Sequence, residues 1–336
     1  MKEGKVSETI LKRSVLRGIK QRRPEVLVKA SVGEDCAAIQ LQEGEVLVLS
    51  TDPITGVAKD IGIYGVGITA NDIAASGAEF IGIMLTILLP CPAEEEDLKQ
   101  IMKDVETGCS NLGAQILGGH TEVSKAVNQP ILSITGVGKV LKDKLIKTSA
   151  ACPGDEIIMT KGAGIEGTSI IAREKEEELS SRYSKEFIDK GKSLIESISV
   201  VPEAKIAASY GVSSMHDVTE GGVFGALWEI AESSKVGVEV DLSKIPVCQE
   251  TIEICEFYDL NPYLLISSGS LLITTPKANQ LVSELEKHNI KATIIGRVTE
   301  GKERIIWNED EKRYLEPPKG DEIYKVIHEE RKGLHE

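Results

Sequence analysis

Aromatic residues are scarce in this chain: Phe, Trp and Tyr together account for 4% of its 336 residues. Apolar residues still make up 41%, so the cores must be built mainly from Ile, Leu, Val and Ala. A chain of this length suits two domains of ordinary size better than one. We therefore expect two aliphatic cores.

Motifs for metal binding by cysteine, for secretion and for membrane insertion are also missing. None of the six cysteines forms a Cys-x-x-Cys pair or a Cys/His cluster with zinc-ligand spacing, which predicts free thiols in a reducing compartment. Residues 1–23 are basic and helical in pattern, without the continuous apolar segment of a signal peptide. The longest apolar run, residues 81–92, is too short to span a bilayer. We expect a soluble, cytoplasmic protein that does not bind membranes.

Positive charge is in deficit, since the formal net charge is −14 and acidic residues occur along the whole chain. Such a balance disfavours binding to nucleic acid, whose phosphates would be repelled. A small phosphorylated ligand remains compatible with it, because Mg²⁺ can bridge carboxylates to phosphates.

The order of predicted elements indicates two α+β domains rather than a doubly wound sheet. In the first half we predict strands at 46–50 (buried), 80–89, 115–117 and 131–137 and helices at 61–77 and 93–111. The pattern breaks at Cys152-Pro153-Gly154, which predicts domains at 1–150 and 151–336. In the second half we predict strands at 155–160, 214–218, 237–241, 270–274 and 292–298 and helices at 174–199, 202–210, 223–234 and 279–288. The last twenty or so residues are polar and charged, which predicts a loosely attached tail.

Four polar segments of the first half contain candidate ligands for a metal ion and for phosphate. They are Gly33-Glu34-Asp35, Thr51-Asp52, Asn71-Asp72 and Gly118-Gly119-His120-Thr121-Glu122, and all but Asn71-Asp72 are expected in turns or at strand ends. Asp72 falls within a helix of small and apolar residues, where it either faces solvent or needs a pairing partner or a metal ion. Mg²⁺ prefers oxygen ligands, and Asp35, Asp52 and Asp72 offer carboxylates from separate elements. Gly118-Gly119 would let backbone N–H groups approach phosphate oxygens closely.

The second half contains two glycine-containing segments that follow predicted strands. Gly162-Ala-Gly164-Ile-Glu-Gly167 matches the dinucleotide-binding pattern, but a charged helix follows it where a second strand ending in an acid is required. A tight turn or a phosphate-lining loop are the alternatives. In His216-Asp217-Val-Thr219-Glu-Gly221-Gly222, Thr219 could cap the next helix, or His216 and Asp217 could face a ligand that the glycines approach.

These segments resemble the superfamily that contains aminoimidazole ribonucleotide (AIR) synthase, the hydrogenase maturation factor HypE, selenophosphate synthetase and thiamine-monophosphate kinase. The matching stretches are Gly33-Glu-Asp-Cys-Ala-Ala38, Ser50-Thr-Asp52, Ala70-Asn-Asp-Ile-Ala-Ala-Ser-Gly-Ala78, Gly118-Gly-His-Thr-Glu122, His216-Asp-Val-Thr-Glu-Gly-Gly222 and Ile266-Ser-Ser-Gly-Ser270. They occur in the order typical of the family, and their residues are most similar to those of HypE-like members. The resemblance implies an N-terminal domain that forms a barrel-like interface in a homodimer, and a C-terminal α+β domain that closes an ATP cleft.

The resemblance also implies roles for individual residues. The metal ligands would be Asp35, Asp52, Asp72 and Glu122, with Mg²⁺ on the ATP phosphates. The nucleotide would be bound by Gly33, Glu34, Thr51, Asn71, Gly118, Gly119, His120, Thr121, Gly221 and Gly222. The residues acting on the substrate would be Asp72, Asp217 and His216.

Departures from the family pattern leave two kinds of function open. HypE itself ends in a cysteine, whereas no cysteine follows Cys255 here. His120 and Glu220 stand where HypE has Asp and Arg. We expect an ATP-dependent enzyme that performs phosphoryl transfer, dehydration or ligation on an unidentified small-molecule, carbamoyl-type or protein-borne substrate. The alternative is a nucleotide-binding partner protein in a maturation complex, without chemistry of its own.

Overall fold

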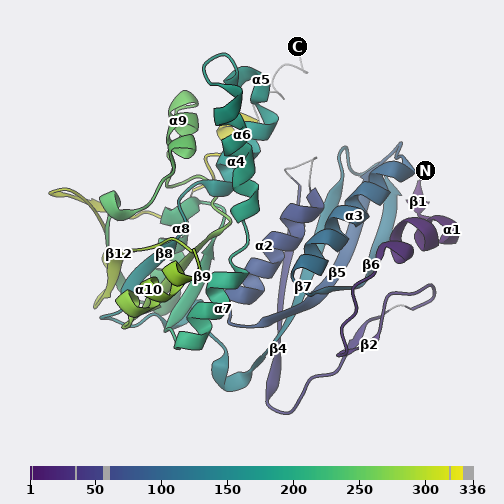
Figure 1. Ribbon diagram of the computed structural model, residues 1–336, viewed down its shortest axis with the longest axis horizontal. Coiled ribbons are helices and arrows are strands. Elements are labelled where there is room, and N and C mark those ends of the chain that lie inside the picture. Colours follow the sequence, from purple (N-terminus) through teal and green to yellow (C-terminus); the bar gives the residue numbers. More distant parts are fainter. Residues whose placement is uncertain (2, 35, 56–60, 318, 328–336) are drawn as a thin grey trace. The chain divides into compact units, whose positions relative to one another are not determined.

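The computed structural model describes residues 1, 3–34, 36–55, 61–317 and 319–327 (Figure 1). The chain divides into two compact units, Met1–Leu145 and Ile146–Glu336. Each unit contains helices and a sheet with both parallel and antiparallel strand pairs, which confirms the predicted α+β class. All six cysteines are free thiols, as predicted. Within the described ranges, no helix is both long and apolar enough to cross a bilayer.

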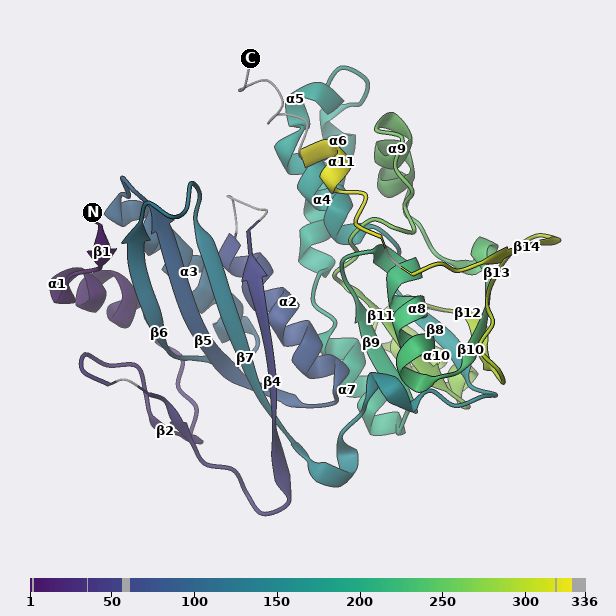
Figure 2. The same cartoon turned by 180° about the vertical axis from the view of Figure 1, so that it is seen from behind.

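Unit 1 is built on a five-stranded sheet with the order β1-β6-β5-β7-β4. Its strands are β1 (Gly4–Lys5), β4 (Glu45–Ile54), β5 (Glu79–Pro90), β6 (Gln115–Ser124) and β7 (Ile131–Leu141), and β2 (Val26–Val28) and β3 (Ala38–Ile39) form a separate ribbon. The helical segments are α1 (Glu8–Ile10), η1 (Leu11–Val15), η2 (Leu16–Gly18), α2 (Ile61–Ala75) and α3 (Glu95–Asn111). Helices α2 and α3 cover one face of the sheet, and the β2 segment lies on the side of the opposite face (Figures 1 and 2).

Small residues let α2 lie close to its sheet. A Cβ atom added to Gly65 would lie 2.4 Å from Ile134 Cδ1, and one added to Gly136 would lie 2.4 Å from Thr69 Cγ2. Contacts this short exclude a side chain at either position without a shift of the neighbouring side chain. The glycines of α2 and β7 therefore set the distance between the helix and the strands, including edge strand β4.

Unit 2 contains a seven-stranded sheet with the order β14-β13-β10-β12-β8-β11-β9. The strands are β8 (Glu156–Thr160), β9 (Ser214–Val218), β10 (Gly237–Asp241), β11 (Ser270–Thr275), β12 (Ala292–Thr299), β13 (Arg304–Asn308) and β14 (Glu311–Tyr314). The helices are α4 (Ile165–Glu174), α5 (Glu176–Leu179), α6 (Lys185–Ser193), α7 (Val201–Tyr210), α8 (Gly222–Ser234), α9 (Gln249–Phe257), α10 (Ala278–Lys287) and α11 (Tyr324–Ile327). Short 3₁₀ turns lie at η4 (Thr148–Ala150), η5 (Leu194–Ser197) and η6 (Leu242–Lys244), and a further one, η3 (Lys142–Lys144), lies at the end of unit 1. Helix α8 covers one face of the sheet, and α7 and α10 cover the other (Figures 1 and 2).

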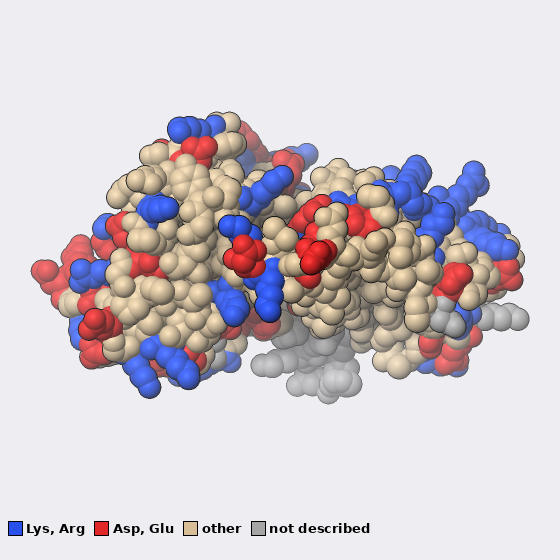
Figure 3. Space-filling model, turned by 90° about the horizontal axis from the view of Figure 1, so that it is seen from below, with Lys and Arg blue, Asp and Glu red and all other residues tan. Residues whose placement is uncertain are grey.

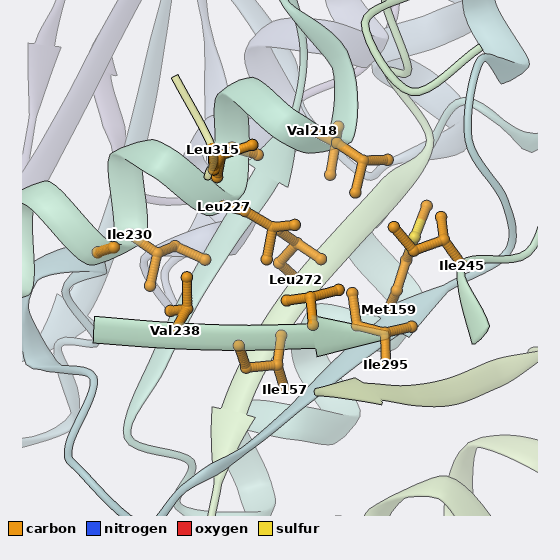
Figure 4. Close-up of a cluster of buried hydrophobic side chains, with 14 of the residues drawn as sticks. Ile157, Met159, Val218, Leu227, Ile230, Val238, Ile245, Leu272, Ile295 and Leu315 are labelled. Carbon is orange, nitrogen blue, oxygen red and sulfur yellow. The ribbon is translucent and has the colours of Figure 1, made fainter. Parts of the chain in front are cut away.

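The core between α8 and its sheet is aliphatic, as the scarcity of aromatic residues predicts. Leu227 and Ile230 of α8 meet Ile157, Val238 and Leu272 from three strands (Figure 4). All five side chains are at most 1% exposed. On the molecular face drawn in Figure 3, acidic and basic side chains are interspersed rather than gathered in fields of one sign.

Several predicted elements need correction. The segment 46–50 lies in an edge strand in which alternate residues face outward, so Leu47 and Leu49 are 45% and 59% exposed. The predicted helix 174–199 is divided into α5, α6 and η5, because the Ser184 side chain caps a new helix at Phe187 N. Helix α9 and the hairpin of β13 and β14 were not predicted.

The described part of the predicted loose tail is docked on unit 2. Asp321, Ile323 and Val326 are only 4–6% exposed. The prediction rested on the polar composition of the segment, which does not reveal the few side chains that face inward.

Replacing Leu227 by Ala should lower the free energy of unfolding of unit 2 by about 2–5 kcal/mol, because a fully buried side chain would leave a cavity. Denaturant titration with a fluorescence or circular dichroism readout measures this difference. The control is Ile252→Ala on α9, whose side chain is 43% exposed, with an expected change within about 0.5 kcal/mol. Equal effects of the two substitutions would contradict this description of the core.

Candidate functional site

Two carboxylates of unit 1 lie against each other on the helix side of the sheet. Asp52 extends from β4 and Asp72 from α2, and the two carboxylates lie close enough for the charge of Asp72 to act on Asp52. Ser50, two residues before Asp52 on the same side of the strand, donates its hydroxyl hydrogen to Asp72 Oδ2. Burial, and then the neighbouring charge of Asp72, raise the pKa of Asp52 to about 6.

This carboxylate pair fits a divalent cation. The Oδ2 atom of Asp52 is buried and has no hydrogen-bond partner among the described residues. Two adjacent carboxylates with an unsatisfied buried oxygen are unfavourable unless a proton or a cation neutralises them. Mg²⁺ commonly uses one or two protein carboxylates and completes its shell with water and phosphate oxygens.

Asp35, the third predicted carboxylate ligand, lies outside the described residues. Within the described ranges, no group of three or more His, Cys, Asp or Glu side chains is placed to hold one metal ion. Asn71, next to Asp72, is completely buried. Thr51 points to the face of the sheet opposite Asp52, because successive strand residues alternate, and its Oγ1 lies 2.9 Å from Thr135 Oγ1.

The Gly118–Glu122 motif lies inside strand β6 rather than in a turn. Gly119 has a φ of 153° and runs so close to β5 that an added Cβ would lie 1.8 Å from Leu85 O. Thr121 is 5% exposed, His120 is exposed and Glu122 is half-buried, and His120 Nε2 lies 3.3 Å from Glu122 Oε2. Gly119 is therefore needed for the close pairing of β6 with β5. In the sequence, a Gly-Gly pair is equally typical of a turn.

A hollow of about 380 Å³ lies over this part of the sheet. Its lining includes Gly118, Gly119 and His120 of β6, Glu34 from the segment after Gly33, and Thr86, Ser133 and Thr135 of β5 and β7. Thr135 contacts Thr51, which places the hollow on the face opposite Asp52. The predicted residues of unit 1 thus fall into two groups: the carboxylate pair on the helix side and the hollow on the open side.

Two small-residue loops of unit 2, at residues 162–167 and 266–270, are in contact. Gly164 N donates to Ser267 Oγ at 2.5 Å, and Gly167 N donates to Ile266 O at 3.0 Å. Ser270 Oγ donates to Gly162 O at 2.7 Å. The dinucleotide-like segment 162–167 is therefore packed against the loop before β11.

Glu166 is a buried acid in this cluster that the sequence analysis did not single out. It is 3% exposed, and its Oε2 atom accepts a hydrogen bond of 3.2 Å from Ser268 N. Burial raises its pKa to about 7, against the lowering effect of Ser268 and with a further raising effect of Asp321. The only signal in the sequence is a glutamate in the first turn of a helix that otherwise begins with small and apolar residues.

His216 and Asp217 are neighbours on β9 and therefore point to opposite faces of the sheet. His216 Nε2 lies 2.8 Å from Glu229 Oε2 of α8, whereas Asp217 is 5% exposed. Gly221 and Gly222 follow β9, with φ values of 84° and 62°. Helix α8 begins at Gly222 with Gly221 as its N-cap residue, so the alternative of Thr219 as the cap is wrong.

Both units match known family models. Residues 33–140 match the N-terminal domain of AIR synthase related proteins, and residues 152–308 match the C-terminal domain. The carboxylate pair, the β6 motif and the loops around Glu166 all lie within the matched residues.

Similar proteins of known name cover most of the chain. A hydrogenase expression/formation protein of Methanocaldococcus jannaschii is 29% identical over 332 residues, which span 96% of this chain and 97% of that protein. The carbamoyl dehydratase HypE of Cupriavidus necator is 28% identical over 279 residues, with coverage of 80% and 77%. A thiamine-monophosphate kinase of Pyrococcus horikoshii is 28% identical over 300 residues, with coverage of 85% and 88%.

Solved structures share the fold of the whole chain. Escherichia coli HypE superposes with a TM-score of 0.80 at 22% identity, covering 95% of this chain and 99% of that one. A HypE structure in complex with ATP gives a TM-score of 0.77 at 22% identity, with coverage of 92% and 93%. A chain of a HypE–HypF complex gives 0.70 at 22% identity, with coverage of 83% and 92%.

Replacing Asp52 by Asn should stabilise the metal-free protein by about 1 kcal/mol at pH 8, because a carboxylate with a raised pKa destabilises the fold once it is ionised. The advantage should fade as the pH falls from above 6 toward 4, where wild-type Asp52 is protonated in the folded protein. Added Mg²⁺ should raise the melting temperature of the wild type and leave that of the variant unchanged. Differential scanning calorimetry with and without chelator measures both effects.

The matched control is Asp97→Asn, an exposed carboxylate in the first turn of α3. This variant should keep both the pH profile and the Mg²⁺ response of the wild type. If Asp52→Asn behaves like the control, the carboxylate pair is not a cation site.

Proposed function

Because this chain belongs to the AIR synthase-related superfamily, we propose that it is an ATP-dependent enzyme whose N-terminal unit binds Mg²⁺-ATP. The observation that carries the proposal is the contact between Asp52 and Asp72, which places two carboxylates and one unsatisfied buried oxygen together. A HypE relative with the same fold has been solved in complex with ATP.

Asp52 and Asp72 are the residues that would hold the cation. The resemblance also names Asp35, which lies outside the described residues, and Glu122, which lies beside His120 on the opposite face of the sheet. A bound Mg²⁺ would neutralise phosphate charge and help orient the transferred group. Ser50 fixes the rotamer of Asp72 through its hydroxyl group, so one carboxylate of the pair is already oriented. Catalysis at such a site consists mainly of positioning and of compensating charge.

The β6 motif is proposed to line the nucleotide, together with Gly33, Glu34 and Thr51. The hollow of about 380 Å³ beside Gly118, Gly119 and His120 has the size typical of small-molecule sites, about 300–1,000 Å³, and supports ligand binding by this motif. It lies on the face of the sheet opposite Asp52, so it is not evidence for direct contact with a cation held by Asp52 and Asp72. We propose residues 1–150 as the Mg²⁺-ATP domain and residues 151–336 as the domain for the acceptor. In the latter, Asp217, His216, Gly221 and Gly222 are the proposed acceptor-side residues.

The named relatives act on acceptors of different chemistry. The HypE relatives are carbamoyl dehydratases, the Pyrococcus horikoshii relative is a thiamine-monophosphate kinase, and a further relative is a selenide, water dikinase. A kinase transfers a phosphoryl group of ATP to its substrate, and an ATP-driven dehydration can use the same transfer with phosphate as the leaving group. We therefore propose a phosphoryl transfer to an oxygen nucleophile, either retained as a phosphate ester or used to drive dehydration or ligation.

A second candidate function is that of a nucleotide-binding partner protein without its own chemistry. A HypE relative crystallised in complex with HypF favours this candidate, because that fold supports docking to another protein. The release of ADP separates the two candidates, because both proposed outcomes of phosphoryl transfer produce it. Turnover of ATP supports the enzyme, and binding without turnover supports the partner protein.

A homodimer is proposed through the open side of the unit 1 sheet, in line with the barrel-like interface that the resemblance implies. The ten-residue strand β4 lies at the sheet edge. Two of its side chains, Leu47 and Leu49, are 45% and 59% exposed. Leu141 of the neighbouring strand β7 is 49% exposed. Large apolar side chains along a long edge strand are unfavourable in water unless another chain covers them.

Replacing Leu49 by Asp should convert the dimer into a monomer, because a charge would be buried in the interface. Sedimentation velocity measures the change. The control Ile252→Asp, at an exposed apolar position of unit 2, should remain dimeric. A wild-type monomer, or a dimeric Leu49→Asp variant, would contradict the proposed interface.

Replacing Asp72 by Asn should weaken Mg²⁺-ATP binding by at least about tenfold, since loss of groups that only orient metal ligands already costs about 10–100-fold. Isothermal titration calorimetry with ATP, in the presence of Mg²⁺ or of a chelator, tests this effect. Asp97→Asn should bind like the wild type. Binding of equal strength in Asp72→Asn and in the wild type would remove Asp72 from the site, and no binding in the wild type would overturn the proposed function.

A further inference from the structure

The end of the described chain forms an ordered extension of unit 2. After β14, the described residues 315–317 and 319–327 include four side chains that are only 4–9% exposed, those of Leu315, Asp321, Ile323 and Val326. The extension ends in the one-turn helix α11. The segment lies beyond residues 152–308, the part that matches the C-terminal family domain.

Asp321 is the polar centre of this segment. Its Oδ2 atom accepts a hydrogen bond of 2.7 Å from Gly221 N. Its Oδ1 atom accepts bonds of 3.1 Å from Ile266 N and 2.9 Å from Ile323 N. One buried carboxylate therefore joins the loop after β9, the loop before β11 and its own segment.

The next residue strengthens the attachment to the loop before β11. Glu322 Oε2 accepts a bond of 3.0 Å from Asn261 N. The backbone N–H of Glu322 donates to Leu264 O at 3.4 Å. The segment thus contacts both ends of the 261–266 loop.

The two loops held by Asp321 also pack directly on each other. A Cβ added to Gly222 would lie 2.6 Å from Tyr263 O and 2.8 Å from Leu265 O. Phe224 N donates to Tyr263 O at 3.1 Å, and the Phe224 and Tyr263 rings are stacked with centroids 5.3 Å apart. Contacts of this closeness tolerate little change in the spacing of the loops.

We infer that residues 319–327 form a strap and that Asp321 is a positioning residue, which holds the Gly221–Gly222 and Ile266–Gly269 loops at the spacing that the acceptor side of the site requires. This inference rests on the proposed function for the role of those loops. The strap joins elements that lie far apart in the chain, and charge-assisted bonds to a carboxylate are stronger than neutral ones. The strap also positions the loop at residues 162–167 indirectly. Glu166 accepts a hydrogen bond from Ser268 N, and Gly167 N donates one to Ile266 O.

The test compares Asp321→Asn with Asp241→Asn in the full-length protein. Asp241 is a partly exposed carboxylate of the same unit. Among its described contacts it accepts hydrogen bonds from Ser243 and forms an ion pair with Lys244 at 3.8 Å. An amide at position 321 turns an N–H group toward at least one of the three backbone donors. In Asp321→Asn, hydrogen exchange of peptides containing Gly221 and Ile266 should accelerate at least about tenfold. Loss of a hydrogen bond to a charged acceptor makes local opening more frequent by about this factor.

Steady-state ADP release provides a readout that a purely structural role would not change selectively. The kcat of Asp321→Asn should fall at least about tenfold with the KM for ATP unchanged, because small displacements of positioning groups cost about 100-fold. Asp241→Asn should match the wild type in both measurements.

If hydrogen exchange at Gly221 and Ile266 is as slow in Asp321→Asn as in the wild type, the inferred strap is wrong. Acceleration spread equally over β8 and β11 would overturn its positioning role, since the effect would then be global. If Asp321→Asn does not fold, Glu322→Gln replaces it: faster exchange confined to the 261–266 loop supports the strap, and unchanged exchange overturns it. If the wild type fails to bind Mg²⁺-ATP, the proposed function falls, while the exchange measurements still decide on the strap.

Discussion

The close packing of α2 on its sheet forces the carboxylates of Asp52 and Asp72 into contact, and the functional interpretation of unit 1 depends on this constraint. Glycines at positions 65 and 136 let the helix approach the strands, and the helix brings Asp72 beside the strand that presents Asp52. Two like charges at this distance store unfavourable energy in the metal-free protein. The same arrangement lowers the cost of binding a cation, because the ligands need not be brought together when it binds.

Unit 2 uses buried carboxylates differently. Glu166 and Asp321 accept hydrogen bonds from backbone N–H groups of the loops around β9 and β11. Their partners are N–H groups that would otherwise be buried without acceptors, and such groups are expensive to leave unpaired. The pair of Asp52 and Asp72 in unit 1 needs a ligand, whereas Glu166 and Asp321 in unit 2 accept backbone hydrogen bonds and hold loops in place. The contrast favours unit 1 as the cation-binding unit.

The sequence predicted the α+β class, most of the strands and helices and the candidate residues Asp52 and Asp72, because these rest on local patterns. It did not predict that Gly118-Gly119 lies inside a strand, since glycine serves both a turn and a close strand pairing, and only the register with β5 distinguishes them. Strand alternation places Thr51 and Asp52 on opposite faces of one sheet, and His216 and Asp217 on opposite faces of the other. The sequence predicts this separation only when each pair is assigned to a strand. Asp321 could not have been found, because its partner Gly221 lies 100 residues away and its own segment is polar.

The central claim is that Asp52 and Asp72 together bind the metal ion that accompanies ATP. The most direct measurement is a crystal structure grown with Mn²⁺ and a non-hydrolysable ATP analogue, with anomalous scattering used to locate the metal. The account predicts an anomalous peak within coordination distance of carboxylate oxygens of both Asp52 and Asp72, with phosphate oxygens completing the shell. A nucleotide bound with its metal elsewhere, while Asp52 and Asp72 remain in contact through a shared proton, would contradict it.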